Sequence, residues 1–336
     1  MQNHEPNAAE SAAPIGAVTR AEYDALTRGA GVRIMTERIV VRVIGDDRVS
    51  FLHGMCSNDI KKANPGAVVP ALFLTEHAHV IAEFFAWIAD DSILIEIDRA
   101  AWTNAHAHLE KLLVADDVEF EETRLEVLDL EGPRAADVVQ VVANAPVPPP
   151  WQWAQVSGFM VANLPRAGAD AITVLLDSDR AAATVDAIEA LGSDFRPVGF
   201  AALDTLRIEN GIARVGIDTS DKTIALEARL SRDISFDKGC YVGQETIERA
   251  TARGGLKKKL FGLCFEGSRM PELDTMLILE GKEVGRLTSV ASSPKFGVIG
   301  LAVLHHSAWK PGTRLADSSG EINATVTDIP FGQGLK

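Results

Sequence analysis

The stretch Lys238-Gly239-Cys240-Tyr241-Val242-Gly243-Gln244-Glu245 sets one of the chain's three cysteines between two glycines and beside an aromatic ring. Glycine adopts backbone angles and close approaches that other residues avoid, so the two glycines predict a tight loop. A lysine near a cysteine favours the thiolate form of the sulfur. Cys240 is therefore a candidate reactive group, with Lys238 as the residue that tunes it. The alternative is that Cys240 is a small, buried apolar residue.

The composition indicates a soluble globular protein of two or three modules. A chain of 336 residues exceeds the usual size of one hydrophobic core, and 46% hydrophobic residues is typical of globular proteins. No apolar run approaches the roughly 20 residues that span a bilayer, so no membrane association is predicted. Residues 1–19 contain no lysine or arginine, which argues against a signal or transit peptide.

The net charge and the number and spacing of the cysteines argue against further classes of protein. A net charge of −14 argues against nucleic-acid binding, which needs a basic face. The three cysteines are far apart and form no CxxC pair, so neither a disulfide framework nor a structural zinc site is expected. They also cannot supply four thiolates to an iron–sulfur cluster from this chain alone. We therefore expect a reduced, cytoplasmic protein without a metal site of its own.

The pattern of apolar runs predicts an α+β fold. Strands are expected near residues 38–45, 68–74, 80–88, 92–97, 118–131, 155–163 and 171–177. Asp98 is placed to cap a helix that reaches Leu113, with Trp102, Leu109 and Leu112 on its buried face. Asp179 is placed to cap a second helix over residues 180–191.

The pattern changes after Gly255. Six short strands are expected at residues 260–265, 275–279, 283–290, 297–304, 313–317 and 321–329. Strands at this spacing, with no helix between them, are typical of a small barrel or sandwich. The predicted domains are residues 20–255 and 256–336.

Several segments together resemble one family. The opening stretch resembles the KGCYxGQE motif of YgfZ-like proteins, which belong to the tetrahydrofolate-binding superfamily of the glycine-cleavage T-protein, an aminomethyltransferase. Residues 45–52 with 57–60, residues 206–212, and residues 285–289 with Ser293-Pro294 resemble further blocks of that superfamily, in the same order. The resemblance implies two interlocked α+β lobes followed by a C-terminal β-barrel.

The resemblance also implies a folate site. Glu209, in Arg207-Ile208-Glu209-Asn210-Gly211, corresponds to a glutamate that binds the pterin of tetrahydrofolate or a derivative. A carboxylate suits that role because it accepts two adjacent N–H donors of the pterin edge. The other predicted folate-binding residues are Arg207, Tyr241, Gln244 and Arg253. The alternative for Glu209 is a surface carboxylate paired with Arg207.

One departure from the T-protein bears on the activity. The acidic pair that T-proteins carry on a strand corresponds here to Ala82-Glu83. The resemblance therefore implies a YgfZ-like folate-binding accessory factor for iron–sulfur cluster assembly or repair, with iron–sulfur client or scaffold proteins as partners and Cys240 as the reactive group. The alternatives are a folate-dependent aminomethyltransferase or related one-carbon transferase or demethylase, and a folate-binding scaffold without activity.

Overall fold

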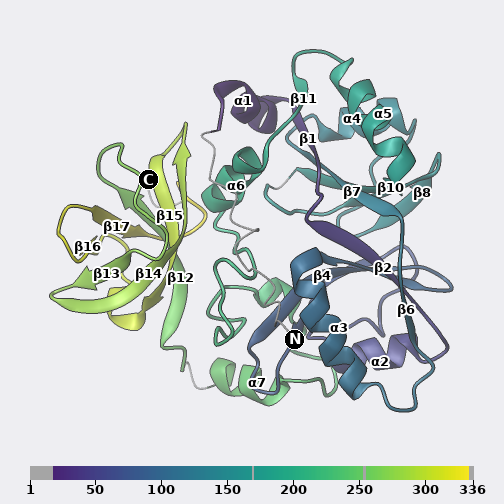
Figure 1. The fold of residues 1–336 in the computed structure, drawn as a ribbon, viewed down its shortest axis with the longest axis horizontal. Coiled ribbons are helices and arrows are strands. Elements are labelled where there is room, and N and C mark those ends of the chain that lie inside the picture. The colour runs from purple at the N-terminus through teal and green to yellow at the C-terminus, as the bar shows by residue number, and fades with distance from the viewer. Residues whose placement is uncertain (1–17, 169, 253–254, 333–336) are drawn as a thin grey trace, which may run out of the picture.

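The computed structural model describes residues 18–168, 170–252 and 255–332. The first lobe is built on a six-stranded sheet with the order β11-β1-β7-β10-β9-β8, antiparallel except for the parallel pair β1–β11. Helices α1, α4 and α5 pack on this sheet (Figure 1). The bounds are α1 (Arg20–Arg28), β1 (Ala30–Ile34), β7 (Leu125–Glu131), α4 (Ala135–Val142), β8 (Trp153–Val156), β9 (Phe159–Asn163), β10 (Ala171–Asp177), α5 (Ser178–Glu189) and β11 (Phe195–Pro197).

The second lobe is built on an antiparallel five-stranded sheet with the order β3-β4-β5-β2-β6. Its elements are β2 (Arg38–Ile44), α2 (Arg48–Met55), β3 (Val68–Leu74), β4 (Val80–Ile88), β5 (Ile93–Asp98), α3 (Arg99–Leu112) and β6 (Glu119–Glu122). The chain forms β1 in the first sheet, builds the whole second sheet, and then returns to the first sheet with β7. The predicted interlocking of the two lobes is thereby confirmed.

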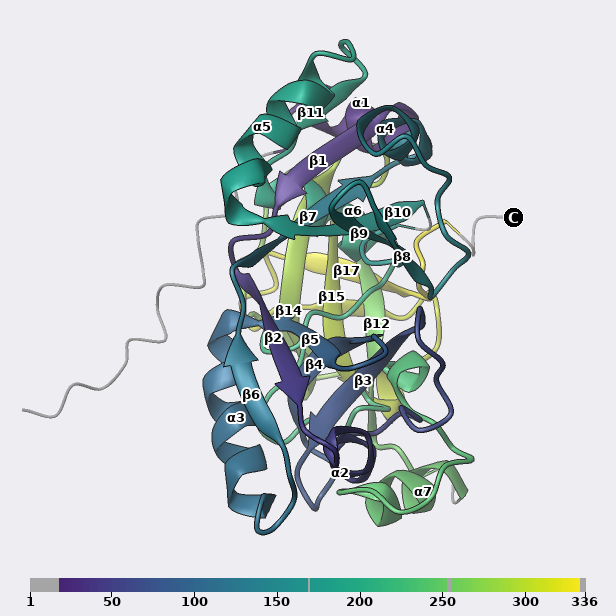
Figure 2. The same ribbon diagram turned by 90° about the vertical axis from the view of Figure 1, so that its right-hand side faces the viewer.

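The C-terminal part is a closed six-stranded barrel, as predicted, with the order β12-β15-β14-β13-β16-β17. Figure 2 shows the barrel behind the two stacked lobes. Its strands are β12 (Lys258–Phe265), β13 (Met276–Leu279), β14 (Lys282–Ser293), β15 (Gly297–His305), β16 (Arg314–Ala316) and β17 (Asn323–Thr327), and η2 (His306–Ala308) follows β15. Aliphatic and aromatic side chains from these strands fill the barrel interior.

Helix α6 (Phe200–Glu209) joins the first lobe to the barrel, because it contacts α1 on one side and β14 and β15 on the other. Every residue from Ala202 to Glu209 is buried, as expected of a helix surrounded by protein. Beyond α6, the chain runs through η1 (Ser231–Asp233) and α7 (Gln244–Ala252) to the barrel. In the part of the chain that the structure describes, no helix combines the length and the apolar character needed to span a bilayer.

Two local predictions about helices can be compared with the structure. The Asp98 carboxylate accepts hydrogen bonds from the amides of Ala100 and Ala101, so it caps α3 as expected. Leu112, the last residue of α3, is 39% exposed rather than buried, whereas Trp102 and Leu109 are buried as predicted. Helix α5 begins at Ser178, which places Asp179 within the first turn instead of at the cap.

Candidate functional site

A cavity of about 520 Å³ lies where the two lobes meet α6. Strands β1, β2, β4 and β7, the N-terminus of α3, α6 and the segment after α6 all contribute to its walls. The residues that line it are Arg33, Met35, Glu37, Arg38, Ile81, Glu83, Phe85, Asp98, Ala100, Ala101, Asn104, Asp129, Arg166, Ala167, Phe200, Leu203, Asp204, Arg207, residues 212–217 and Arg232. Its volume is in the range of small-molecule sites, about 300–1,000 Å³.

The alternation of side chains along β4 explains how one strand serves both the cavity and the core. Successive residues of a strand point to opposite faces. Ile81, Glu83 and Phe85 line the cavity, whereas Ala82 and Phe84 are buried in the hydrophobic core of the second lobe. Of the predicted counterpart of the acidic pair, Ala82-Glu83, only the glutamate therefore reaches the cavity.

The cavity is rich in charge, with six arginines and five carboxylates in its walls. Most of these charges are paired within the protein. Arg33 and Glu37 form a two-pronged pair with N–O distances of 2.7 and 2.8 Å, and Arg232 lies 3.0 Å from Glu83. The guanidinium of Arg214 instead stacks over the ring of Phe200, 4.6 Å from its centroid.

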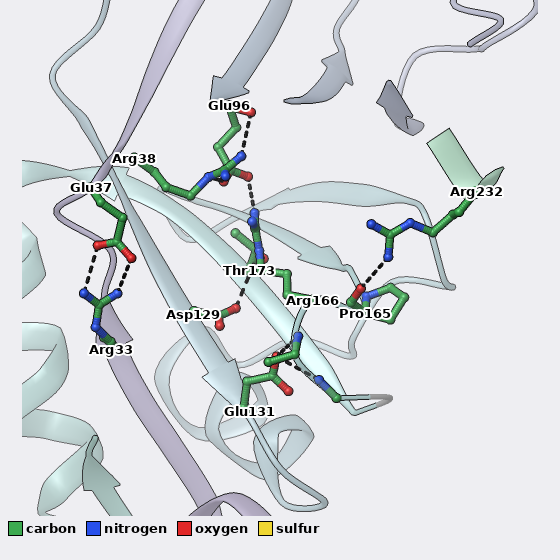
Figure 3. Close-up of polar contacts among 12 residues, drawn as sticks. Arg33, Glu37, Arg38, Glu96, Asp129, Glu131, Pro165, Arg166, Thr173 and Arg232 are labelled. Carbon is green, nitrogen blue, oxygen red and sulfur yellow. Dashed lines mark hydrogen bonds and ion pairs between the residues drawn. The ribbon is translucent and has the colours of Figure 1, made fainter. Parts of the chain in front are cut away.

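Behind this wall lies a buried network of charged side chains (Figure 3). Glu96 on β5 is fully buried and forms ion pairs with both Arg38 and Arg166. Burial raises the pKa of the Glu96 carboxyl, but the two guanidinium groups outweigh burial and leave that pKa below its ordinary value. Glu96 is therefore ionised and joins the two lobes, since Arg38 belongs to the second lobe and Arg166 to the loop between β9 and β10.

Two further carboxyls of this network lie on β7. Asp129 lines the cavity, and burial raises its pKa to about 6 in spite of the opposing charge of Arg166. The Glu131 carboxyl accepts hydrogen bonds from the amides of Ala167 and Gly168, at 2.8 and 3.3 Å. Burial and the nearby Asp129 charge raise the pKa of Glu131 to about 8. Both carboxyls therefore hold protons more tightly than exposed ones do.

Arg207 and Glu209 both bond to barrel strand β14, because Arg207 donates to the Ser289 hydroxyl at 2.7 Å and Glu209 accepts from the Ser293 hydroxyl. Only one of the two lines the cavity. Arg207 lines the cavity and is paired with Asp204 at 2.8 Å, whereas Glu209 is absent from the lining. The Glu209 carboxylate accepts hydrogen bonds from the hydroxyls of Tyr23, at 3.1 Å, and Ser293. Glu209 therefore lies at the contact between α1, α6 and the barrel, and its pterin-binding role stays a prediction.

Lys238 is also placed differently from its prediction as the residue that tunes Cys240. Its side chain is buried, and the ammonium donates hydrogen bonds to the carbonyl oxygens of His53, Cys56 and Asn58, with distances of 2.5, 2.7 and 2.9 Å. These carbonyls lie at and just beyond the C-terminal end of α2, where a cation is favourable. The lysine therefore holds the loop at residues 238–245 against α2.

The loop itself leaves Cys240 exposed. Tyr241 is buried, with its ring 5.0 Å from the Lys238 ammonium. Gly243 has φ +87°, and a Cβ there would lie 2.7 Å from the Thr75 carbonyl oxygen, so this position requires glycine. Gly239 has open space around it. The loop conformation therefore requires glycine at position 243 but not at position 239.

The structure thus separates the predicted site residues into two groups. Of the described ones, only Arg207 lines the cavity; Glu209, Lys238, Cys240, Tyr241 and Gln244 do not. Gln244 begins α7 and bonds to Glu248, and Arg253 lies outside the described residues. Of the other charged residues of the cavity, sequence reasoning named only Glu83, in the counterpart of the acidic pair, and Asp98, as a helix cap, and it assigned neither to the site. A signal was present, because charges interrupt apolar strands at Glu83 in β4, Glu96 in β5 and Asp129 in β7.

Comparisons with known proteins agree with this architecture. The "GCVT N-terminal domain" family matches residues 5–238, and the "Glycine cleavage T-protein C-terminal barrel domain" family matches residues 258–332. The fold resembles a solved aminomethyltransferase T of the glycine cleavage system from Bartonella henselae, with a TM-score of 0.84, 21% identity, and coverage of 95% of this chain and 90% of the other. At that identity, the likeness concerns the fold alone.

Curated relatives of similar sequence agree with this family assignment. An aminomethyltransferase of Deinococcus deserti is 27% identical over 329 residues, which is 93% of this chain and 88% of that protein. A chloroplastic protein of Arabidopsis thaliana with a provisional transferase name is 27% identical over 318 residues, or 92% of this chain and 72% of that protein. Two interlocked α+β lobes with a C-terminal barrel and a central charged cavity define a T-protein-like protein. The chain belongs to the GCVT family, in the folate-binding, aminomethyltransferase-type superfamily.

Proposed function

We propose that this protein binds tetrahydrofolate or a derivative in the cavity and acts as a YgfZ-like accessory factor for iron–sulfur cluster assembly or repair. The observation that carries the proposal is the ion pair between Glu83 and Arg232. Glu83 holds the second position of the predicted acidic pair, but Arg232 lies 3.0 Å from it. A carboxylate that already accepts a hydrogen bond from a guanidinium of the protein is less available to a reacting group. The cavity is therefore better suited to binding a folate than to catalysing transfer from it.

The charge of the cavity fits a folate. The chain carries a net charge of −14, yet six arginines face five carboxylates in the cavity walls. A folate combines flat aromatic rings with an anionic glutamate tail. Phe200 offers aromatic surface, and Arg214, whose guanidinium lies over that ring, has no ion-pair partner among the residues described. Arg214 is therefore the residue we propose for the tail carboxylates.

The accessory role rests on the thiol outside the cavity. Cys240 is exposed, whereas Cys56 is fully buried and Cys264 half-buried. An iron–sulfur cluster takes about four protein ligands, so a cluster in contact with Cys240 needs ligands from a partner protein. An exposed thiol is accessible to such a partner. We propose iron–sulfur client or scaffold proteins as partners and the cytoplasm as the location.

Complementation tests this proposal. The protein is expressed in a bacterial strain that lacks its YgfZ-like protein, and the activity of an iron–sulfur enzyme is measured beside tetrahydrofolate binding by the purified protein. We expect restored enzyme activity and saturable binding. Binding without rescue would refute the accessory role, and rescue without binding would refute the folate part.

The second candidate is a folate-dependent aminomethyltransferase or a related one-carbon transferase or demethylase. Two observations favour it: a carboxylate, Glu83, does face the cavity, and relatives carry the name aminomethyltransferase. An assay with the aminomethyl-loaded carrier protein of the glycine cleavage system separates the candidates. We expect turnover about 10²- to 10⁴-fold below that of a T-protein, the usual effect of losing a general acid or base. Comparable turnover would favour the enzyme.

A further inference from the structure

A buried carboxylate connects the cavity wall to the barrel. Asp218 is 1% exposed, and its two oxygens accept hydrogen bonds from four donors. Oδ1 accepts from the hydroxyls of Thr288, at 2.5 Å, and Ser289, at 2.7 Å, both on barrel strand β14. Oδ2 accepts from the Arg207 guanidinium, at 2.5 Å, and from the Arg214 amide, at 2.9 Å. Because a carboxylate offers about four acceptor positions, Asp218 is saturated by partners of its own chain.

Asp218 fixes the backbone of Arg214, a residue of the cavity wall. Residues 212–217 line the cavity, whereas Asp218 does not. Besides the bond from the Arg214 amide to the Asp218 carboxylate, the Asp218 amide donates to the Arg214 carbonyl at 2.8 Å. The Arg214 guanidinium lies over the Phe200 ring, 4.6 Å from its centroid, and has no carboxylate partner among the residues described. Asp218 therefore holds a cavity arginine in place without neutralising the charge of its guanidinium.

The other end of this segment is bonded to the same barrel strand. The Ile212 carbonyl accepts from the Arg207 guanidinium at 3.2 Å, and the same guanidinium donates to the Ser289 hydroxyl at 2.7 Å. Ser289 is 2% exposed and in turn donates to Asp218. Both ends of the segment are thus bonded, through Arg207 and Asp218, to one buried serine of the barrel. A displacement of β14 relative to α6 would therefore move the wall of the cavity.

We infer that Asp218 is a positioning residue through which the barrel sets the affinity of the cavity for its anionic ligand. Strand β14 holds Asp218, Asp218 holds the backbone of Arg214, and Arg214 meets the tail carboxylates of the folate. This inference rests on the proposed folate binding and on the proposed role of Arg214. An arginine that is held in place before the ligand arrives loses less conformational freedom on binding, which increases the affinity. The barrel thereby contributes to the site, although none of its described residues lines the cavity.

Calorimetry tests the effect on affinity. Tetrahydrofolate is titrated, under reducing conditions, into the wild type, Asp218→Asn, Ser289→Ala and the control Ser92→Ala. Ser92 is buried in the turn between β4 and β5, and its hydroxyl bonds to Asp91 outside the cavity. Ser289→Ala should bind tetrahydrofolate about 3- to 10-fold more weakly than the wild type, the usual effect of having to order one long side chain, and Asp218→Asn at least as weakly. Ser92→Ala should bind as tightly as the wild type.

Two further measurements separate positioning from a general loss of stability. In the Arg214→Gln background, Ser289→Ala should cause little further loss of affinity, because the residue through which it acts is gone. Hydrogen exchange, followed by mass spectrometry without ligand, should be faster over residues 212–218 in Ser289→Ala and Asp218→Asn than in the wild type. Ser92→Ala should leave the exchange of this segment unchanged.

The outcomes separate this inference from the proposed function. A wild type that binds no folate refutes the proposed function together with the effect on affinity, while hydrogen exchange still decides whether the barrel holds the segment. Unchanged exchange in Ser289→Ala refutes the positioning, even if Asp218→Asn fails to fold. Equal affinity of Ser289→Ala and the wild type, or an undiminished loss in the Arg214→Gln background, refutes the action through Arg214.

Discussion

The cavity and the cysteine loop at residues 238–245 present their reactive groups in opposite ways. In the cavity wall and the network behind it, most charged side chains are paired within the protein, as Glu83 is with Arg232 and Glu96 with Arg38 and Arg166. In the loop, the lysine is buried and committed to backbone carbonyls, while the thiol of Cys240 is exposed. This difference underlies the two separate tasks that we propose, because a site of paired charges suits a small ligand and an exposed thiol is accessible to another macromolecule.

The first prediction concerns the thiol and is the largest in effect. Cys240→Ser should abolish rescue of iron–sulfur enzyme activity, because an alcohol neither binds iron as a thiolate does nor exchanges with thiols. The affinity for tetrahydrofolate and the melting temperature should stay within error, since Cys240 is exposed and outside the cavity. Cys264→Ser, in barrel strand β12, is the matched control and should rescue fully. If Cys240→Ser rescues fully or fails to fold, the thiol has no separate task.

The second prediction concerns the buried charge that joins the lobes. Glu96→Gln should lower the free energy of unfolding by about 3–5 kcal/mol, since two buried guanidinium groups lose their carboxylate. Urea unfolding measures the change. The exposed Glu122 of β6, in the same sheet, provides the control: Glu122→Gln should change the stability by less than about 0.5 kcal/mol. Equal stabilities of the two variants would show that the network does not hold the lobes together.

The third prediction compares the two glycines of the loop. Gly243→Ala should cost about 1–3 kcal/mol of stability, because the position has φ +87° and lies against the Thr75 carbonyl. Gly239→Ala, with open space around it, should change stability by less than about 0.5 kcal/mol. Thermal unfolding of both variants measures these two changes in stability. A larger loss in Gly239→Ala would contradict the loop conformation described above.

The fourth prediction uses the raised pKa of Glu131, about 8 against 4.5 for an exposed glutamic acid. Between these values the folded state binds the proton and the unfolded state does not, so stability falls as the pH rises through this window. The slope for one proton is at most about 1.4 kcal/mol per pH unit. Glu131→Gln removes this titration. The stability of the variant relative to the wild type should therefore increase from pH 5 to pH 8.5, as measured by urea unfolding. A constant difference would show that burial does not hold the proton on Glu131.

The sequence by itself determined the architecture, because local signals agree with the tertiary fold there. Alternating apolar runs separated by Gly, Pro, Asp and Ser predicted the six barrel strands, and Asp98 before an amphipathic stretch predicted the start of α3. The order of short motifs pointed to the superfamily. Helix α6 was not predicted from the sequence. It is buried on all sides, and its sequence therefore lacks the one-sided apolar pattern that is typical of a surface helix.

The candidate site could be predicted only in part, and the reason is geometric. Sequence proximity suggested that Lys238 serves Cys240 and that Arg207 and Glu209 share a site. The fold instead places the lysine at the end of α2, and it places Arg207 in the cavity wall and Glu209 outside it, although both bond to barrel strand β14.

Residues far apart in the chain meet in the cavity wall and the buried network behind it: Arg38, Glu96, Asp129 and Arg166 come from separate elements of two interlocked lobes. A charge within an apolar strand can be seen in a sequence, but its partner cannot, because the partner depends on how the sheets come together. The sequence therefore determined which fold forms and which residue types are available to it. Only the tertiary structure decided which of them are paired and which are exposed, because both depend on how the two sheets and the barrel come together.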